Sequence, residues 1–266
     1  MDIQNILGKL LKREISIEEA ERLIKLTAIE EVGEIAKLDI NRCLRTGVPE
    51  IILAEGKSSD DLSEIVIKGL EKSGRVILSR VNDEQLEFIQ RNIPNSAITK
   101  VNKKARMMVI KKKDFMFESY GGKVGILAAG TSDIPVAEEA RVVAEEMGCT
   151  VFAAYDVGVA ALHRLLLPLK EIIQNDADSL IVVAGREGAL PSVIAGLVDV
   201  PVIGVPTSIG YGLGEKGVSA LMAMLQACSL GLAVVNIDGG VAAGAIAALI
   251  ANRVAKARHS HNATRI

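Results

Sequence analysis

The chain has 266 residues, of which 49% are hydrophobic and 24% charged, and its formal net charge is −2. A chain of this length forms one large domain or two ordinary ones. The small net charge creates no global field toward nucleic acid or acidic lipid, and an aromatic content of 3% without Trp disfavours recognition by base stacking. The three Cys show no metal-ligand spacing, and an odd, scattered set suits a reducing compartment.

The N-terminus lacks the basic segment and the apolar run of a secretory signal. The longest apolar run, near residues 241–250, is too short and too rich in Gly and Ala to span a bilayer. We therefore expect a soluble, cytoplasmic protein that binds neither a membrane nor nucleic acid.

The first 120 residues have the pattern of a small α/β module. We expect helices over residues 3–11, 16–26, 60–72 and 84–91, and strands over 51–54, 75–79 and 107–110. A turn marked by Gly47 and Pro49 lies among the charged residues Asp39, Arg42, Arg45, Glu50 and Lys57. These charges form either a surface cluster of salt bridges or an anion-binding lid over the second domain. Residues 115–122 are the expected linker.

Residues 123–254 organise the chain, because short β-branched runs alternate there with helical patterns. We expect strands over residues 124–128, 150–154, 180–184, 200–205 and 232–237, a closing helix over 242–257, and a polar tail over 258–266. The alternation predicts βαβ units and a parallel sheet. In such sheets the ligand lies beyond the carboxyl ends of the strands, where the loops are rich in small polar residues. We therefore expect this half to hold the chemistry.

The loop after the first of these strands reads Gly130-Thr-Ser-Asp133 and is followed by Pro135. Pro at the first helical position, with Ser or Asp before it, marks a helix start. The exposed N–H groups at such a start suit a phosphate or a carboxylate. A plain helix cap would explain one polar residue, but not four small residues in a row.

Two later loops carry further candidates. Glu187 is a candidate general base and Arg186 a candidate clamp for phosphate or carboxylate, although a Gly-bracketed Arg-Glu pair can also be simply solvated. Residues 212–217 match the pattern G-x-G-x-x-G. They begin six residues after the strand, whereas the dinucleotide fingerprint follows its strand directly, so a Rossmann site is disfavoured.

Cys228 has two interpretations. A lone Cys is usually a small buried hydrophobe, whereas one on a turn of small residues can be a thiolate nucleophile. Cys228 precedes the last strand, in a helix-to-strand connection. The βα pattern places that connection at the opposite end of the sheet, so the thiol would reach a site only across a subunit interface or if the connection folds back.

Four motifs in the second half resemble the PurE family of aminoimidazole ribonucleotide carboxylases. They are Gly-Thr-Ser-Asp-Ile-Pro at 130–135, Leu-His-Arg at 162–164, Val-Val-Ala-Gly at 182–185 and Pro-Val-Ile-Gly-Val-Pro at 201–206. One PurE loop reads Ala-His-Leu-Pro, but residues 188–191 read Gly-Ala-Leu-Pro and lack the His. The turn that reads Met-Pro in PurE contains Cys228 here.

Over essentially its full length the chain resembles LarB, the family of nickel-pincer nucleotide cofactor biosynthesis. The motifs Arg-Thr-Gly-Val-Pro-Glu at 45–50 and Glu-Gly-Lys at 55–57 belong to a first half that PurE lacks. The resemblance implies an α/β fold, in which a small α/β module (residues 1–120) precedes a PurE-like, flavodoxin-like three-layer parallel sheet (121–257). It also implies that nicotinic acid adenine dinucleotide and CO2, or bicarbonate, become pyridinium-3,5-biscarboxylic acid mononucleotide and AMP.

The resemblance further implies roles for individual residues. Cys228 would be the nucleophile, Glu187 the base, and Asp133 an acid that holds the ring, a carboxylate or Mg²⁺, the expected cofactor. The substrate-binding residues would be Gly130, Thr131, Ser132, Arg186, Gly188, Thr207, Ser208, Asn236, Arg45 and Lys57. PurE-like proteins form octamers, so a homo-oligomer, an octamer, is expected. The closing helix, rich in Gly and Ala, suits close packing either between subunits or within one subunit.

Two other functions stay open. One is a purine-pathway carboxylase or mutase that acts on aminoimidazole ribonucleotide, against which the missing His and the presence of Cys228 argue. The other is a nucleotide-binding protein without activity, against which the joint presence of Asp133, Glu187 and Cys228 argues.

Overall fold

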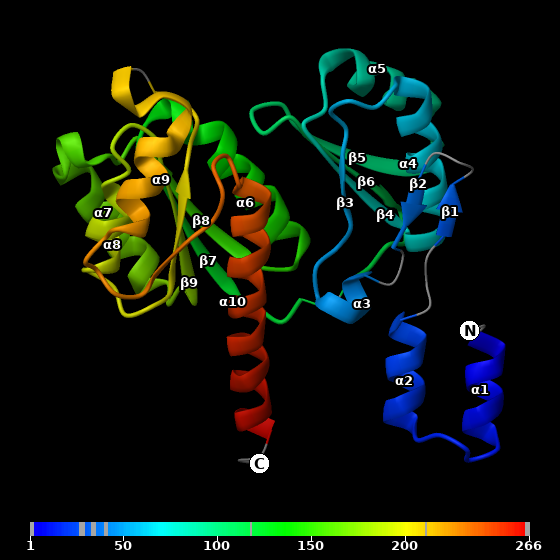
Figure 1. Ribbon diagram of the computed structural model, residues 1–266. Coiled ribbons are helices and arrows are strands. Elements are labelled where there is room, and N and C mark those ends of the chain that lie inside the picture. Colours follow the sequence, from blue (N-terminus) through cyan, green and yellow to red (C-terminus); the bar gives the residue numbers. More distant parts are fainter. Residues whose placement is uncertain are drawn as a thin grey trace. The chain divides into compact units, whose positions relative to one another are not determined.

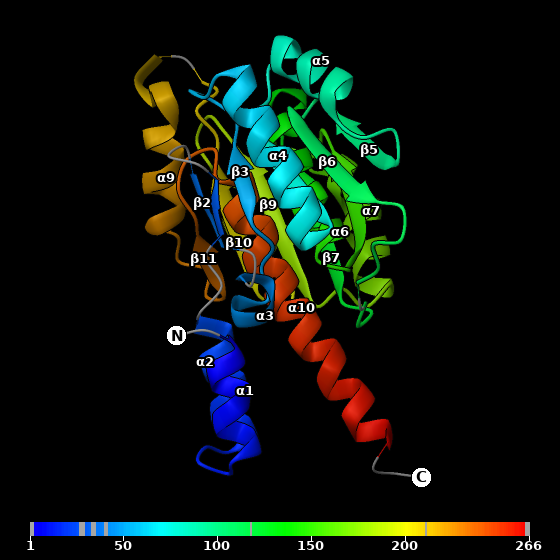
Figure 2. The same ribbon diagram turned by 90° about the vertical axis from the view of Figure 1, so that its right-hand side faces the viewer.

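The computed structural model describes residues 3–26, 30–32, 36–39, 42–117, 119–210 and 212–263. The chain divides into two compact units, Met1–Val101 with Met107–Phe115, and Asn102–Arg106 with Met116–Ile266. Both units combine helices with a β-sheet (Figures 1 and 2), so the α/β class predicted from the sequence is confirmed.

The first unit contains a four-stranded sheet in the order β3-β4-β6-β5 and a separate β1-β2 pair. Its elements are α1 (Ile3–Leu11), α2 (Ile17–Leu26), β1 (Glu30–Val32), β2 (Ala36–Leu38), α3 (Arg42–Thr46), β3 (Ile51–Leu53), α4 (Ser59–Ser73), β4 (Arg75–Ser79), α5 (Asp83–Asn92), β5 (Ala97–Asn102) and β6 (Met107–Lys112). Strands β3 and β4 are parallel and joined by α4, whereas β4 and β6 are antiparallel.

Local signals explain the boundaries of the helices in this unit. The Ser58 hydroxyl caps α4 by accepting from Asp61 N at 3.1 Å, and Gly74 ends the helix in the left-handed conformation. Asn82 and Gln85 form a capping box at the start of α5. Three strands were not predicted. β1 and β2 have only three residues each, and β5 carries mostly exposed or half-buried side chains.

The second unit contains a five-stranded sheet in the order β11-β10-β9-β7-β8, in which all four strand pairs are parallel. Its elements are β7 (Lys123–Ala128), α6 (Ile134–Glu146), β8 (Thr150–Tyr155), α7 (His163–Gln174), β9 (Ser179–Ala184), α8 (Leu190–Ala195), β10 (Val202–Pro206), α9 (Val218–Leu225), β11 (Leu232–Val234) and α10 (Gly240–Ala263). This is the flavodoxin-like strand order, which reverses direction between β7 and β9 and so places a ligand crevice there.

The helices of the second unit form two layers around the sheet. Helices α6 and α10 cover one face, and α7, α8 and α9 cover the other (Figure 1). The central strand β9 is buried along its whole length, as expected for a parallel strand with both faces covered. Short 3-10 helices at Thr131–Asp133, Val159–Ala161 and Gly212–Gly217 follow three of the strands.

Helix α10 packs closely on α6 through small residues. A Cβ on Gly240 would lie 2.3 Å from the carbonyl oxygen of Val136, and one on Gly244 would lie 2.5 Å from that of Ala140. The two glycines and their two partners are each one helical turn apart, so α10 presents a stripe without side chains to the α6 backbone. Of the two packing modes considered from the sequence, this contact is the one within a single subunit.

One sequence prediction about the helices is wrong. Helix α10 continues to Ala263, so most of the expected polar tail is helical; Arg258 near its end pairs with the buried Asp178 at 2.7 Å. The segment Gly240–Ser260 is, by length and composition, long and apolar enough to cross a membrane, although the apolar run alone is short. Its packing on α6 and the sheet buries part of this apolar surface, mainly alanines.

We predict that Gly244→Val lowers the free energy of unfolding by about 2–3 kcal/mol, because the new side chain must push α10 away from the Ala140 carbonyl. The control is Ala257→Val, at an exposed position of the same helix, which should cost about 0.5 kcal/mol or less. Urea denaturation followed by circular dichroism measures both. Equal losses in the two variants would contradict a tight α6–α10 contact.

Candidate active site

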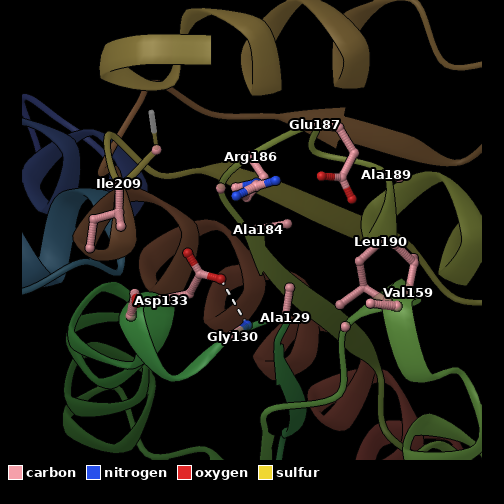
Figure 3. A pocket seen from close by; sticks show the side chains of 15 residues that line it. Ala129, Gly130, Asp133, Val159, Ala184, Arg186, Glu187, Ala189, Leu190 and Ile209 are labelled. Carbon is pink, nitrogen blue, oxygen red and sulfur yellow. Dashed lines mark hydrogen bonds between the residues drawn. The ribbon is translucent and has the colours of Figure 1, made fainter. Parts of the chain in front are cut away.

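Loops at the carboxyl ends of the parallel strands surround a cavity of 560 Å³, within the usual size range of small-molecule sites. It is lined by Ala129, Gly130, Ser132, Asp133, Gly158, Val159, Ala160, Ala184, Gly185, Arg186, Glu187, Ala189, Leu190, Ile209 and Gly210 (Figure 3). All of these residues belong to the second unit. The loops after β7, β8, β9 and β10 each contribute to the wall.

Asp133 is the buried carboxyl group of this cavity, with 6% of its surface exposed. Its Oδ1 accepts a hydrogen bond from the Thr207 hydroxyl at 2.7 Å, and its Oδ2 accepts from Gly130 N at 2.9 Å. A backbone hydrogen bond from Gly185 reaches the same carboxyl group. Burial raises the pKa of Asp133 above its ordinary value, and the charge of Asp238 adds to the increase, while the three hydrogen bonds oppose it.

Arg186 and Glu187 lie on the loop that follows β9, and Figure 3 shows Arg186 between Asp133 and the Glu187 carboxylate. Arg186 has φ 48° and Gly188 has φ 64°. A Cβ on Gly188 would lie 2.6 Å from the Ala220 carbonyl oxygen, so this position needs Gly. A left-handed conformation is unfavourable for Arg, and such strain gathers at functional sites.

The floor of the cavity is apolar. Ala129 and Ala184 follow or end the two central strands, and the side chains of Val159, Leu190 and Ile209 complete the surface (Figure 3). A cavity with a small apolar floor and a cation and two carboxyl groups at its wall suits a flat ring that carries an anionic substituent.

Five of the residues predicted from the sequence line the cavity: Gly130, Ser132, Asp133, Arg186 and Glu187. Thr207 is fully buried behind Asp133, and Gly188 supports the Arg186 loop. Thr131, Ser208 and Asn236 are exposed and lie outside the lining. Arg45 and Lys57 belong to the first unit, where Arg45 forms an ion pair with Asp39; their binding role stays a prediction.

Cys228 does not line the cavity. Its neighbour Ser229 hydrogen-bonds to Ser192 of α8 at 2.7 Å, and Leu232 pairs with Val202 at the start of β10. Cys228 therefore lies near the amino end of β10, whereas the cavity lies at its carboxyl end. The length of β10 puts roughly 13 Å between the two ends, at 3.3 Å per residue. The sequence argument had placed Cys228 at this opposite end. The side chain is exposed.

The residues present do not fit a protein-bound Mg²⁺. Within the described ranges, no group of three or more His, Cys, Asp or Glu could hold a metal ion. Both oxygens of Asp133, the expected ligand, already accept hydrogen bonds from Thr207 and Gly130.

Sequence reasoning missed part of the cavity lining. Gly158, Val159 and Ala160 follow β8, and Ile209 and Gly210 follow β10. Their position after predicted strands could have identified them, but none carries a reactive group. Asp238 was also missed. It lies outside the lining, and its Oδ1 accepts a hydrogen bond from Ser208 N at 2.8 Å.

The fold and the cavity define a PurE-like α/β enzyme of the carboxylase and mutase class. A family model for AIR carboxylase matches residues 123–265, and a model for the LarB/PurE-like N-terminal domain matches residues 29–113. The chain belongs to the AIR carboxylase family and has the two-domain LarB architecture within it, as the sequence motifs indicated.

The chain is 49% identical over 253 residues to an uncharacterized protein of Methanocaldococcus jannaschii. The alignment covers 94% of this chain and 97% of that relative. It is 34% identical over 124 residues to the N5-carboxyaminoimidazole ribonucleotide mutase of the same organism, covering 46% of this chain and 74% of the mutase. The mutase of Pyrococcus abyssi is 34% identical over 130 residues, 47% of this chain and 71% of that protein.

We predict that Asp133→Asn removes one pH-dependent contribution to stability. Because the pKa of Asp133 is raised in the folded protein, its contribution is present below the ordinary pKa of Asp and is lost as pH rises through the folded pKa. Asn cannot titrate, so Asp133→Asn should lose less stability than the wild type between these pKa values. Urea denaturation at a series of pH values measures this, with Asp199→Asn, at an exposed position, as control. The prediction would be contradicted if the free energies of unfolding of the wild type and Asp133→Asn differed by the same amount at every pH.

Proposed function

We propose that this protein carboxylates the pyridinium ring of nicotinic acid adenine dinucleotide with CO2 and hydrolyses the phosphoanhydride. The products would be pyridinium-3,5-biscarboxylic acid mononucleotide and AMP, for nickel-pincer cofactor synthesis. The observation that carries the proposal is the joining of a LarB/PurE-like N-terminal domain to an AIR carboxylase domain in one chain. The cavity adds chemical support, because its apolar floor, Arg186 and Glu187 suit a carboxylated ring.

The ring must first become nucleophilic. The free meta carbon of a pyridinium is electron-poor and does not attack CO2. A thiolate that adds to the carbon beside the ring nitrogen cancels the positive charge and leaves an enamine-like dihydropyridine. Formation of a neutral adduct from two charged groups is favoured on a surface of low polarity, such as the cavity floor made by Ala129, Ala184 and Leu190.

Carbon–carbon bond formation and loss of a proton then complete the exchange of H⁺ for CO2. The enamine carbon attacks CO2, Glu187 accepts the proton from that carbon, and the thiolate leaves as the ring becomes aromatic again. Arg186 would bind the ring carboxylate, since its planar guanidinium matches two oxygens at once. Ser132 and Thr131, at the start of α6, would bind a phosphate of the substrate.

Cys228 is the proposed nucleophile, and it would come from a second copy of the chain. Within one chain it lies outside the cavity lining. Five large apolar side chains on α9, just after α8 and just before β11 are 51–91% exposed: Leu197, Val218, Met222, Leu225 and Leu230. Large apolar side chains exposed in this number are typical of an interface. An oligomer, as expected for PurE-like proteins, would bury them and bring the thiol to a neighbouring cavity.

One observation favours a second candidate function, an N5-carboxyaminoimidazole ribonucleotide mutase. Relatives with that name are 34% identical over about half of this chain. The loop Gly188-Ala-Leu-Pro191 lacks the His found in PurE, and Glu187 is the ionisable side chain beside it. The two functions require different substrates, so one assay separates them.

We predict that the wild type, mixed with nicotinic acid adenine dinucleotide and bicarbonate, with or without Mg²⁺, releases AMP and a mononucleotide with one extra carboxyl group. Cys228→Ala should lower the rate at least about 10³-fold, because no other group replaces the thiolate. Mass spectrometry detects both products, with Cys43→Ala, at an exposed thiol, as the matched control. Consumption of aminoimidazole ribonucleotide instead would favour the mutase, and inertness to both substrates would reject both enzymes.

We predict that subunits carrying Cys228→Ala and subunits carrying Glu187→Gln, each inactive alone, regain activity when co-expressed. In a 1:1 hybrid, half of the subunits supply each intact group, so about a quarter of the sites contain both. Differently tagged subunits confirm that hybrids form, and the product assay measures the rate. Hybrids as inactive as the parent variants would show that the thiol does not act across a subunit interface.

A further inference from the structure

Asp238 lies in the turn between β11 and α10, outside the residues that the proposed chemistry uses. Its backbone is left-handed, with φ 56°, and Gly239 N closes the turn by donating to Asn236 O at 3.0 Å. Asp and Asn adopt this conformation more readily than other residues with a side chain. The turn therefore holds the Asp238 carboxylate in a defined place.

Asp238 binds the end of β10 at two points. Its N–H donates to Pro206 O at 2.9 Å, and its Oδ1 accepts from Ser208 N at 2.8 Å. The regular β10–β11 pairing ends at Gly204 and Val234. The Asp238 carboxylate thus takes the place that a strand carbonyl would occupy and continues the ladder past its end.

The residue between these two points is Thr207, which is fully buried. Its hydroxyl donates to Asp133 Oδ1 at 2.7 Å, so the path of residues 206–208 determines where this hydrogen bond points. The same segment also contacts the loop that carries Arg186, because a Cβ on Gly185 would lie 2.5 Å from Ile209 O and 2.6 Å from Thr207 Oγ1. The segment that Asp238 holds therefore contacts both Asp133 and the loop that carries Arg186.

We propose that Asp238 is a positioning residue of the active site, which fixes residues 206–209 and through them Thr207, Asp133 and the Ile209 wall. It acts through its hydrogen bond to Ser208 N, not by contact with the substrate. The inference rests on the proposed function only where turnover is used as the readout, because the position of the loop can be measured directly.

The chain allows a test in which the turn itself is kept. Asp238→Gly removes the acceptor, and Gly adopts the left-handed backbone freely. Asp238→Asn keeps both the acceptor oxygen and the preference for this backbone. The control is Asp176→Gly, because Asp176 is also left-handed, with φ 59°, and its side chain is 72% exposed.

Hydrogen–deuterium exchange of the peptide that covers residues 206–210 gives the readout that does not depend on activity. Loss of one backbone hydrogen bond should speed exchange at Ser208 on the order of ten-fold in Asp238→Gly. Asp238→Asn should exchange at nearly the wild-type rate, and Asp176→Gly should leave this peptide unchanged. Unaltered exchange in Asp238→Gly, or equal acceleration in the Gly and Asn variants, would overturn the proposal.

Turnover of nicotinic acid adenine dinucleotide gives the functional readout. We expect Asp238→Gly to lower kcat about ten-fold or more, because misplaced groups lose rate even when the substrate still binds, with a smaller change in KM. Asp238→Asn should restore kcat to within about two-fold of the wild type. A wild type without turnover would refute the proposed function, while the exchange rates would still decide the role of Asp238.

Discussion

The carboxyl group of Asp133 accepts hydrogen bonds from the ends of three strands, and the shape of the cavity depends on it. Gly130 follows β7, Gly185 follows β9, and Thr207 follows β10. Because the three loops share this one buried acceptor, the Asp133 carboxyl group helps to keep them in register. Burial of such a group costs free energy unless its hydrogen bonds are made, so the same group that shapes the cavity also opposes the opening of any one loop.

Two kinds of close approach make this arrangement possible, and both need glycine. At the cavity, Gly185 leaves room for the Thr207 hydroxyl and the Ile209 carbonyl. Behind the sheet, Gly240 and Gly244 bring α10 onto α6. Helix α6 begins directly after Asp133, so its seat on α10 also decides where that carboxyl group lies. Packing on the far face of the sheet and chemistry at its edge are thus coupled through one helix.

The sequence predicted the architecture well, because β-branched runs, caps and glycines act locally. It also identified Asp133, Arg186 and Glu187 as candidates, because they lie in the loops that follow β7 and β9. It could not reveal Asp238, since the partner of its side chain is the amide of Ser208, thirty positions away in the chain. Nor could it give the wall around Val159, where an apolar side chain in a loop looks the same whether it faces a ligand or the protein interior. The length of α10 was missed because its last turns depend on a distant ion pair with Asp178.

The contact between α6 and α10 has a consequence for biosynthesis. These are the first and the last helices of the second unit, and they lie side by side on one face of its sheet (Figure 1). During translation, α6 and the strands β7, β9 and β10 emerge before α10, which packs on them. The apolar face that they form therefore has no covering helix until α10 leaves the ribosome. Contacts between such distant segments also slow folding. We therefore expect chaperones to bind this apolar face of the nascent second unit until α10 has been synthesised.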